Sequence, residues 1–346
     1  MSTFPRNSSS RDALFAALKK QIVQLGLLER QPRYYVVKVA LTLALLIPGV
    51  FVLIKFSNVW VQALNAVYFA FAFTQIVFLG HDCGHRQVFR KAGWNDWLAL
   101  LGMPLVGVSY SWWCDAHNRH HRRPNEVNAD PAIDYDLFAF SQSQAIKKER
   151  ITRSLIKFQA FYFLPLTIFY PMAMRLNSVR FMLNNKLSHP VMEPIQFLLH
   201  FPLYFWLVFS HLSLGTGLLF IAIHQSCFSL FLVSTFAPNH KGMMILDEDH
   251  DLDFIHQQVL TAKNVQSTRF ADFWFGGLNY QIEHHLFPNM PRNKLREAQK
   301  TVKSFCRFHS IPYAESTAPR CYWEILKFMH EASRPLRRIA SQDSNI

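Results

Sequence analysis

Histidines at helical spacing are the residues of this chain whose types and positions suggest chemistry. Three short motifs hold them: His81-Asp82-Cys83-Gly84-His85, His117-Asn118-Arg119-His120-His121 and Gln281-Ile282-Glu283-His284-His285. In a helix, residues three and four positions apart lie on one face, so the histidines of each motif are expected to point together. Neutral imidazoles that converge from separate helices suit a first-row transition metal. The three motifs, here called histidine boxes, therefore predict a metal centre.

The alternative is that these histidines are ordinary surface or interfacial residues. The chain has 16 histidines among 346 residues, so a single match to the His-x-x-His-His pattern is modest support. A second His-His pair with Gln281 in the first position, together with the His81–His85 pair, argues strongly against coincidence.

Further residues near the boxes could complete or support the centre. His240 comes just after the last apolar segment and is predicted as an additional ligand. Gln281 could bind the metal weakly through its amide oxygen, or hold a metal-bound water. Polar side chains often orient a ligating histidine by accepting its second N–H. The candidates for this role are Asp82, Asp115, Asp272, Glu283 and Asn239, and Asp130, Asp134 and Asp136 also lie near the boxes. No catalytic residue beyond the metal centre is expected.

Four apolar segments are placed so that they can hold the boxes at a membrane surface. They cover residues 36–56, 59–80, 194–210 and 214–236, and a helix needs about 20 residues to cross the hydrocarbon core. Short links join them into two hairpins, so the boxes and His240 fall on one face of the membrane. The excess of Lys and Arg predicts that this face is cytoplasmic.

Two other apolar segments, residues 98–113 and 158–174, are interrupted by prolines. Basic residues flank the second at both ends, which indicates that both ends lie in the cytoplasm. If either segment crossed the membrane, the boxes would be divided between its two sides. We therefore expect re-entrant or interfacial helices here. The predicted fold class is an all-α integral membrane protein with four transmembrane helices and a cytoplasmic helical cap that holds the metal site.

The composition fits a membrane protein with a substantial aqueous part. Half of the residues are apolar, 17% are charged and the mean hydropathy is +0.05, which excludes a disordered chain and argues against an ordinary soluble enzyme. The net charge of +13 could suggest nucleic acid, but basic cytoplasmic loops explain it without that partner. The five cysteines are irregularly spaced and predict no disulfide framework.

Three regions are expected along the chain. Residues 1–35 form a cytoplasmic N-terminal tail and an amphipathic helix, which could lie on the membrane or pack against the protein. Residues 36–300 form the membrane domain with the boxes. Residues 301–346 form a basic cytoplasmic C-terminal tail.

The boxes, their order and their positions relative to two hairpins resemble the membrane fatty acid desaturases. The resemblance covers residues 35–300, and the third box, with Gln281 in place of a first histidine, is similar to that of front-end and linoleoyl-type acyl desaturases. It implies two iron ions held mainly by histidine, dioxygen as co-substrate, and an acyl-CoA or acyl-lipid that loses two vicinal hydrogens. A ligand where the last span ends, here His240, is also implied.

Many front-end desaturases carry a fused cytochrome b5 domain with an HPGG motif, which this sequence does not contain. We therefore expect a separate electron donor of the ferredoxin, rubredoxin or cytochrome b5 type, with its reductase. Two other functions stay open. One is a lipid or alkane hydroxylase of the same superfamily, and the other is a non-enzymatic membrane metal-binding protein or transporter. The double-bond position and the substrate chain length are not predicted.

Overall fold

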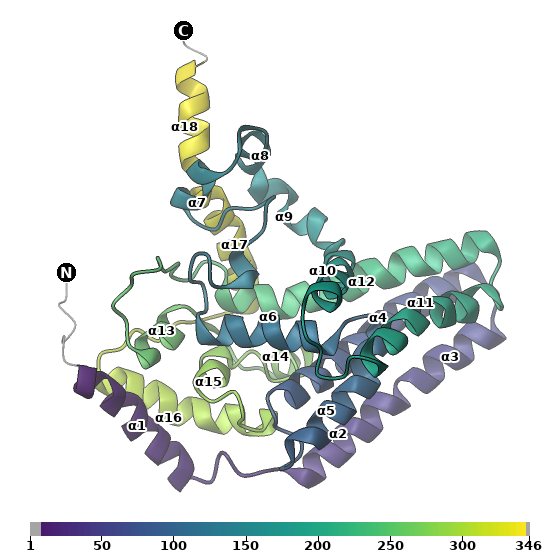
Figure 1. Ribbon diagram of the computed structural model, residues 1–346, viewed down its shortest axis with the longest axis horizontal. Helices are drawn as coiled ribbons and strands as arrows, with labels where there is room; N and C mark the ends of the chain where they lie inside the picture. The colour runs from purple at the N-terminus through teal and green to yellow at the C-terminus, as the bar shows by residue number, and fades with distance from the viewer. Residues whose placement is uncertain (1–7, 344–346) are drawn as a thin grey trace. The chain divides into compact units, whose positions relative to one another are not determined.

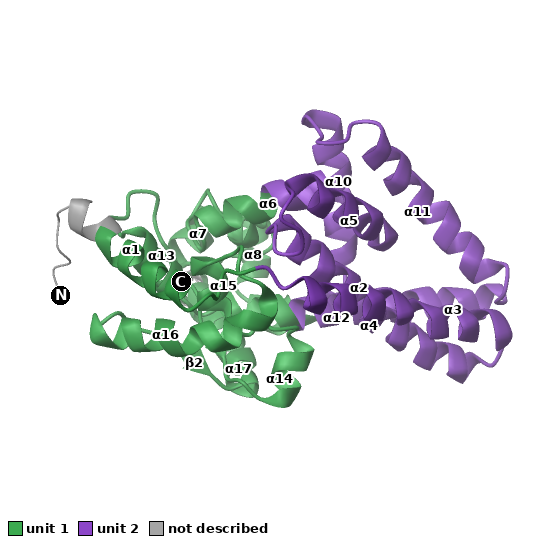
Figure 2. Ribbon diagram, turned by 90° about the horizontal axis from the view of Figure 1, so that it is seen from below, with its two compact units in different colours: residues 1–29, 116–165, 235–346 green, residues 30–115, 166–234 purple. Residues whose placement is uncertain are grey.

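The chain forms two compact units, which a computed structural model describes for residues 8–343. Unit 1 comprises residues 1–29, 116–165 and 235–346, and unit 2 comprises residues 30–115 and 166–234 (Figure 2). Helices α6 (Tyr110–Arg122), α9 (Gln159–Thr167) and α12 (Leu214–His240) have residues in both units. Because each unit combines distant parts of the sequence, the regions expected from the sequence, 1–35, 36–300 and 301–346, do not match the units. They stay a prediction.

The secondary structure is helical, as expected, apart from one pair of short strands in the described residues. The strands β1 (Asn264–Val265) and β2 (Glu315–Ser316) pair in parallel. Unit 2 adds seven elements to the shared helices: α2 (Pro32–Ala44), α3 (Leu46–Lys55), α4 (Val59–Gly84), α5 (Ala92–Gly102), η1 (Met103–Val106), α10 (Tyr170–Asn184) and α11 (Met192–Phe209).

Three helical segments of the described chain are long and apolar enough to cross a membrane. They are Pro32–Lys55, which combines α2 and α3, Val59–Gly84 and Leu214–His240. They confirm three of the four predicted spans by length and composition. Helix α11, at the position of the other predicted span, has 18 residues and contains Pro202. It is not among the three, so the four-span topology stays a proposal.

Both ambiguous segments are broken helices. The pair Ala92–Val106 and Tyr110–Arg122 bends by 104° and is either one broken span or a re-entrant loop. The segment at residues 158–174 is divided between α9 and α10, with Pro165 inside α9 and Pro171 at the start of α10. The first break follows Gly107, which has a left-handed conformation with φ of 73°. At the second break Pro171 stands in the first turn of α10, where its missing backbone N–H is tolerated.

Close packing and buried amides hold the first hairpin together. Asn58 caps α4 by accepting hydrogen bonds from the backbone N–H groups of Trp60 and Val61. Gly49 lets α3 approach α4, because a Cβ there would lie 2.4 Å from the ring of Phe69. The Asn65 amide donates to the Gly49 carbonyl at 3.0 Å. The amide nitrogen of Asn65 is thereby paired inside an apolar hairpin, where an unpaired polar group would be costly.

Unit 1 is built from shorter helices around an apolar core. Its further elements are α1 (Ser8–Gln24), η2 (Pro131–Ile133), α7 (Gln142–Lys147), α8 (Arg150–Ile156), α13 (Phe254–Leu260), α14 (Arg269–Trp274), α15 (Gln281–Leu286), η3 (Arg292–Lys294), α16 (Leu295–Phe308), α17 (Ala318–Ala332) and α18 (Arg334–Asp343). Helices α1 and α16 lie side by side (Figure 1). Leu18 and Ile22 of α1 are fully buried in the core with Ile282 and Val302. The amphipathic helix therefore packs against the protein, and residues 1–7 lie outside the described part of the chain.

Candidate metal centre

The first box lies at the end of α4 in unit 2. Helix α4 continues past the predicted limit at residue 80 and ends at Gly84, so His81 and His85 stand one turn apart with ring centroids separated by 4.7 Å. Both side chains are buried. Asp82 is also buried, and its Oδ1 lies 3.5 Å from Nδ1 of His81, which is at the limit of a hydrogen bond.

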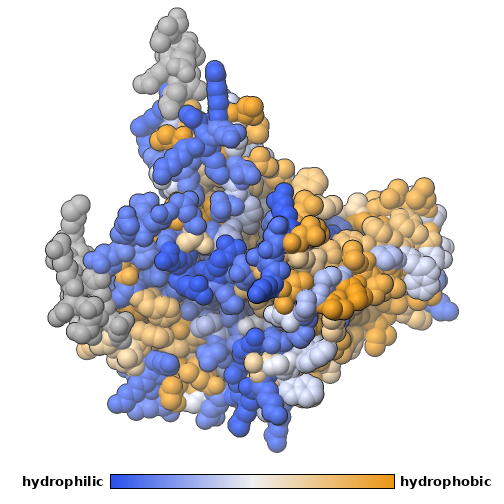
Figure 3. Space-filling model, viewed as in Figure 1, coloured by the Kyte–Doolittle hydropathy of each residue, from blue (hydrophilic) through white to orange (hydrophobic). Residues whose placement is uncertain are grey.

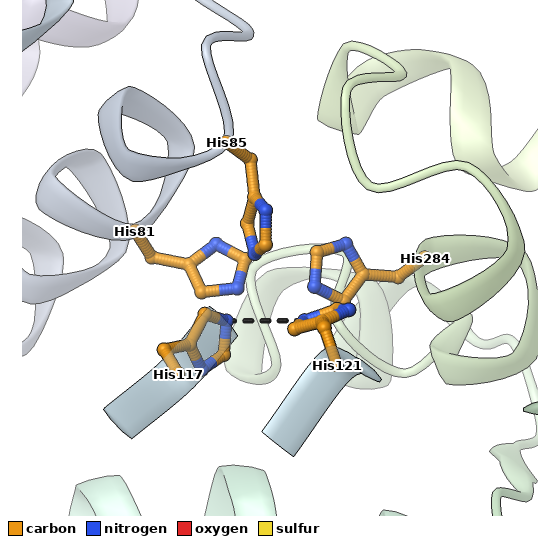
Figure 4. Close-up of side chains that lie close together, drawn as sticks. All are labelled: His81, His85, His117, His121 and His284. Carbon is orange, nitrogen blue, oxygen red and sulfur yellow. Dashed lines mark hydrogen bonds between the residues drawn. The ribbon is translucent and has the colours of Figure 1, made fainter. Parts of the chain in front are cut away.

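The second and third boxes lie in unit 1, on α6 and α15. Nε2 of His117 and Nε2 of His121 are 3.1 Å apart, and Figure 4 marks this contact and shows His284 from α15. One ligand atom from each of these three histidines lies within 4.8 Å of the other two. His121 and His284 have ring centroids 4.7 Å apart. These three imidazoles form what we call group A.

A second set of imidazoles, group B, consists of His120, His240 and His285. Their ligand atoms also lie within 4.8 Å of one another, and Nε2 of His120 is 3.3 Å from Nε2 of His240. Sequence neighbours therefore belong to different groups, His120 and His121 as well as His284 and His285. Consecutive residues of a helix point about 100° apart, which is why the second and the third box each contribute to both groups.

Each group B histidine has an acceptor at Nδ1. Nδ1 of His120 lies 2.9 Å from Oδ2 of Asp130, and Nδ1 of His240 lies 3.0 Å from the Thr261 carbonyl. Nδ1 of His285 lies 2.9 Å from Oε1 of Gln258, whose amide nitrogen donates to the His121 carbonyl. Carboxylate and carbonyl oxygens accept only, so in each ring Nδ1 carries the proton.

The protonation of Nδ1 leaves a lone pair on Nε2 of each neutral ring in group B. Nε2 of His285 is buried and has no hydrogen-bond partner. Burial, followed by the neighbouring imidazoles of His240 and His120, holds the pKa of His285 well below its usual range, so this ring is neutral. Two Nε2 lone pairs 3.3 Å apart, as in His120 and His240, repel unless a cation lies between them. This donor set fits a bound metal ion.

Asp130 supplies the negative charge nearest to group B. Burial alone would raise the pKa of this carboxyl, but the electrostatic interaction and hydrogen bond with His120, together with the charge of Lys241, outweigh burial, and the pKa falls to about 2. The carboxylate also accepts from the backbone N–H of Asn125 at 2.7 Å and of Ala132 at 2.8 Å. Asp130 therefore stays ionised and orients the His120 ring.

Gln281 lies between group B and Asn239. The Asn239 amide nitrogen donates to the Thr235 and Leu278 carbonyls and to Oε1 of Gln281. This leaves Nε2 of Gln281 facing Nε2 of His240 at 3.0 Å. The amide nitrogen, rather than the oxygen considered from the sequence, thus points toward the histidines. Asn239 contacts Gln281 and not an imidazole.

Two other acidic candidates, Glu283 and Asp272, form hydrogen bonds that support the chain around the third box. The Glu283 carboxylate accepts from Asn264 at 2.6 Å and from the Tyr313 hydroxyl at 2.8 Å, and burial raises its pKa to about 7 despite these bonds. Asp272 accepts from Asn279 and Tyr280 just before the third box. Asp115 is exposed on α6. The orienting role stays a prediction for all three.

Sequence reasoning missed several residues that position the boxes. Gln258 and the Thr261 carbonyl orient two group B rings, although they are 27 and 21 positions away from those histidines. Oδ1 of Asn264 accepts a hydrogen bond from the backbone N–H of Ile282 at 2.9 Å and so anchors α15. No spacing pattern marks these residues, because a long-range contact leaves no local signal. Asp130 was only one of several nearby acids in the sequence.

Comparisons with known proteins show which family this sequence resembles. The sequence model of the family described as "Fatty acid desaturase" matches residues 58–317. The chain is 30% identical to a Delta(8)-fatty-acid desaturase of Euglena gracilis, over 86% of this chain and 74% of that protein. It is 28% identical to an acyl-lipid (9-3)-desaturase of Physcomitrium patens, over 92% of this chain and 62% of that protein. A Delta(6)-fatty-acid desaturase of Caenorhabditis elegans is also 28% identical, over 86% of this chain and 70% of that protein.

Proposed function

The chain belongs to the fatty acid desaturase family, and from this premise we propose that it introduces a double bond into a long-chain acyl group with two irons and dioxygen. Family membership and the histidine groups make it an enzyme that desaturates fatty acyl chains at a histidine-ligated metal centre. The observation that carries the two-iron proposal is the separation of the histidines into group A and group B.

We assign one iron to each group. His117, His121 and His284 of group A would hold one iron, and the resemblance to the family implies that His81 and His85 of the first box are metal ligands as well. His120, His240 and His285 would hold the other. Eight imidazoles are more than one octahedral ion accepts, which supports two ions. Neutral nitrogen ligands suit first-row transition metals, and we propose iron as the metal.

The chemistry of the substrate explains why such a centre is needed. A methylene group of an acyl chain offers no acid or electrophile to ordinary side chains, and bound iron with dioxygen would supply the strong oxidant. Loss of two hydrogens from the chain, with two electrons and two protons from outside, reduces one dioxygen to two waters. The electrons therefore come from a donor, for which we propose a separate ferredoxin, rubredoxin or cytochrome b5 type protein.

The protein's own part is to hold and shield the centre. Asp130, Gln258 and the Thr261 carbonyl fix the direction of the three Nε2 lone pairs in group B. His240 and His285 are buried, which helps to exclude water from the centre. We further propose a front-end reaction, because the relatives include Delta(8) and Delta(6) desaturases. An acyl-CoA or acyl-lipid substrate, four spans and a cytoplasmic centre complete the proposal.

The test is expression of the chain in a desaturase-deficient host, followed by fatty-acid profiling with double-bond location and by metal analysis of the purified protein. We expect a new unsaturated acid and about two irons per chain. Alanine at any box histidine or at His240 should abolish the product while the protein stays in the membrane. His309→Ala, outside both groups, is the matched control. A product that has gained oxygen would indicate a hydroxylase, and one iron with all eight histidines required would refute the two-iron centre.

Gln281 offers a sharper test of group B. Gln281→Ala removes the amide that faces His240, so we expect most turnover to be lost while much of the iron is retained by the histidines. Gln281→His restores a nitrogen ligand and should recover part of the activity. Gln266→Ala, at an exposed position, controls for the loss of an amide. Near-normal turnover of Gln281→Ala would remove Gln281 from the centre.

A further inference from the structure

Two basic segments of unit 1 meet on one surface that contains none of the histidines of groups A and B. Residues 147–157 contain five Lys or Arg and one acid, and residues 330–338 contain three Arg and one acid. Ile156 of α8 and Leu336 of α18 are buried in one apolar cluster. The Arg337 guanidinium donates to the Lys157 carbonyl at 3.2 Å. The two segments are thus fixed together, and their charges add.

The α18 side of this surface is hollowed and lined mainly by cations. The hollow, of about 430 Å³, is lined by His330, Glu331, Arg334, Arg337 and Arg338. Arg334, Arg337 and Arg338 stand at positions i, i+3 and i+4 and so share one helix face. Arg334 lies 3.7 Å from Glu331, with both side chains about half exposed. The hollow therefore carries a net positive charge and is large enough for a phosphate group.

Large apolar side chains lie exposed beside these charges. Ile151 is 81% exposed and Phe161 is 77% exposed, and Leu155 and Phe158 are exposed as well. On α8, Ile151 and Leu155 are one turn apart, whereas Arg150 and Arg153 lie on a different strip of the same helix. Hydrophobic and hydrophilic residues lie next to each other over this part of unit 1 in Figure 3. Removing such side chains from water is favourable, because the hydrophobic effect scales with the apolar area that is buried.

We propose that this basic–apolar surface, formed by α8, the start of α9 and α18, binds anionic phospholipids. The arginines of the hollow would contact headgroup phosphates, and Ile151 and Phe161 would enter the interfacial region of the bilayer. An acidic protein could satisfy the charges, but it would not by itself account for exposed Ile and Phe along the same surface. An amphipathic face with flanking cations is the pattern of helices that lie on anionic membranes. The chain also carries segments able to span a membrane, so lipid is always near.

Hydrogen–deuterium exchange of the full-length protein in lipid nanodiscs tests this proposal. We expect the amides of residues 150–161 to exchange more slowly in discs that contain phosphatidylglycerol than in discs of phosphatidylcholine alone. One basic residue near an anionic surface contributes about 1 kcal/mol, or about fivefold in binding. The double variant Arg153→Gln, Arg334→Gln should therefore lose most of the difference in exchange between the two lipids. Adding Ile151→Ser and Phe161→Ser should reduce this difference further. Added salt should weaken it.

Matched variants and a competing ligand make the result decisive. Lys19→Gln with Lys20→Gln removes two exposed cations from α1 in the same unit and should leave the lipid effect unchanged. Thermal melting in phosphatidylcholine discs checks that all variants are folded. Equal exchange in both lipids, or an equal loss in the α1 variant, would refute the proposal. Protection by polyglutamate in neutral discs without protection by phosphatidylglycerol would also refute it, in favour of an acidic protein partner.

Discussion

At the scale of single residues, the direction of each imidazole depends on the atom that meets its Nδ1. In group B these atoms are Oδ2 of Asp130, Oε1 of Gln258 and the Thr261 carbonyl. Such partners fix the tautomer, and their loss commonly weakens metal binding 10- to 100-fold. Substituting the residues that carry these acceptors therefore tests the metal centre, as substituting the histidines does.

Gln258→Leu should lower metal retention by roughly 10- to 100-fold, because Nδ1 of His285 loses its acceptor. Gln258→Glu keeps an oxygen at that position and should retain more metal than the Leu variant. The measurement is metal content after graded exposure to a chelator. Gln257→Leu is the control, since the Gln257 amide approaches His250 and no group B ring. Equal metal retention in the two Leu variants would contradict the orienting role of Gln258.

Asp130→Asn should make the metal-free protein less stable at neutral pH. The pKa of Asp130 is about 2 in the folded protein against an ordinary value of 3.8. Because the folded-state pKa is depressed, the stabilisation is present above about pH 4 and is lost as the pH falls toward 2. A difference of this size corresponds to about 2 kcal/mol. Thermal melting of both proteins across this range should show the deficit shrinking in acid, and a deficit that is constant with pH would contradict the prediction.

At the scale of elements, a tight turn determines where the third box begins. Gly276 and Gly277 both have positive φ, and in Gly277 φ is +87°. A Cβ on Gly277 would lie 2.8 Å from Cγ of Arg292. The turn leads to Asn279, which donates to Asp272, and then directly to the short helix α15. Helix α15 has only six residues, so its position depends on this turn and on Asn264 more than on its own hydrogen bonds.

Gly277→Ala should destabilise the protein by more than about 1 kcal/mol, because the left-handed conformation and the contact with Arg292 both oppose a side chain. It should also lower metal content, since α15 carries His284 and His285. Gly93→Ala is the matched control, as nothing lies within 4 Å of a Cβ there and Gly93 belongs to helix α5. Thermal melting and metal analysis would count against this account if both alanine variants behaved alike.

At the scale of the whole molecule, the path of the chain through the membrane depends on whether α11 crosses it. Three segments qualify as spans by length and composition, whereas box placement on one face requires α11 to cross as well. Helix α11 contains Glu193, which accepts from Ser109 and Ser111. Pairing of this buried acid reduces the cost of placing it in or near the membrane.

Cysteine labelling in oriented vesicles should place Ser57→Cys and Ser213→Cys on one side and Ser143→Cys on the other. Ser57 lies between α3 and α4, Ser213 lies between α11 and α12, and all three serines are exposed. Membrane-impermeant reagent is added from each side in turn, and the wild-type protein measures the background from native cysteines. Labelling of Ser213→Cys from the same side as Ser143→Cys would exclude the four-span topology.

The sequence by itself determined the local features of this protein. Helical periodicity and apolar length placed the spans near Pro32–Lys55, Val59–Gly84 and Leu214–His240, and the spacing of the boxes predicted imidazoles on common helix faces. These properties depend on residues close together in the chain, so a short stretch of sequence contains them. The family resemblance added the reaction, which the comparisons support.

The tertiary structure decided how the histidines are shared and which residues orient them. The sequence suggested that His117, His120 and His121 point together, but the structure separates His120 from the other two. Consecutive side chains of a helix point about 100° apart, so His120 and His121 pack against different neighbours. The contacts of His285 with Gln258 and of His240 with the Thr261 carbonyl join residues 27 and 21 positions apart. Such contacts arise only when the chain folds back on itself, and no local pattern records them.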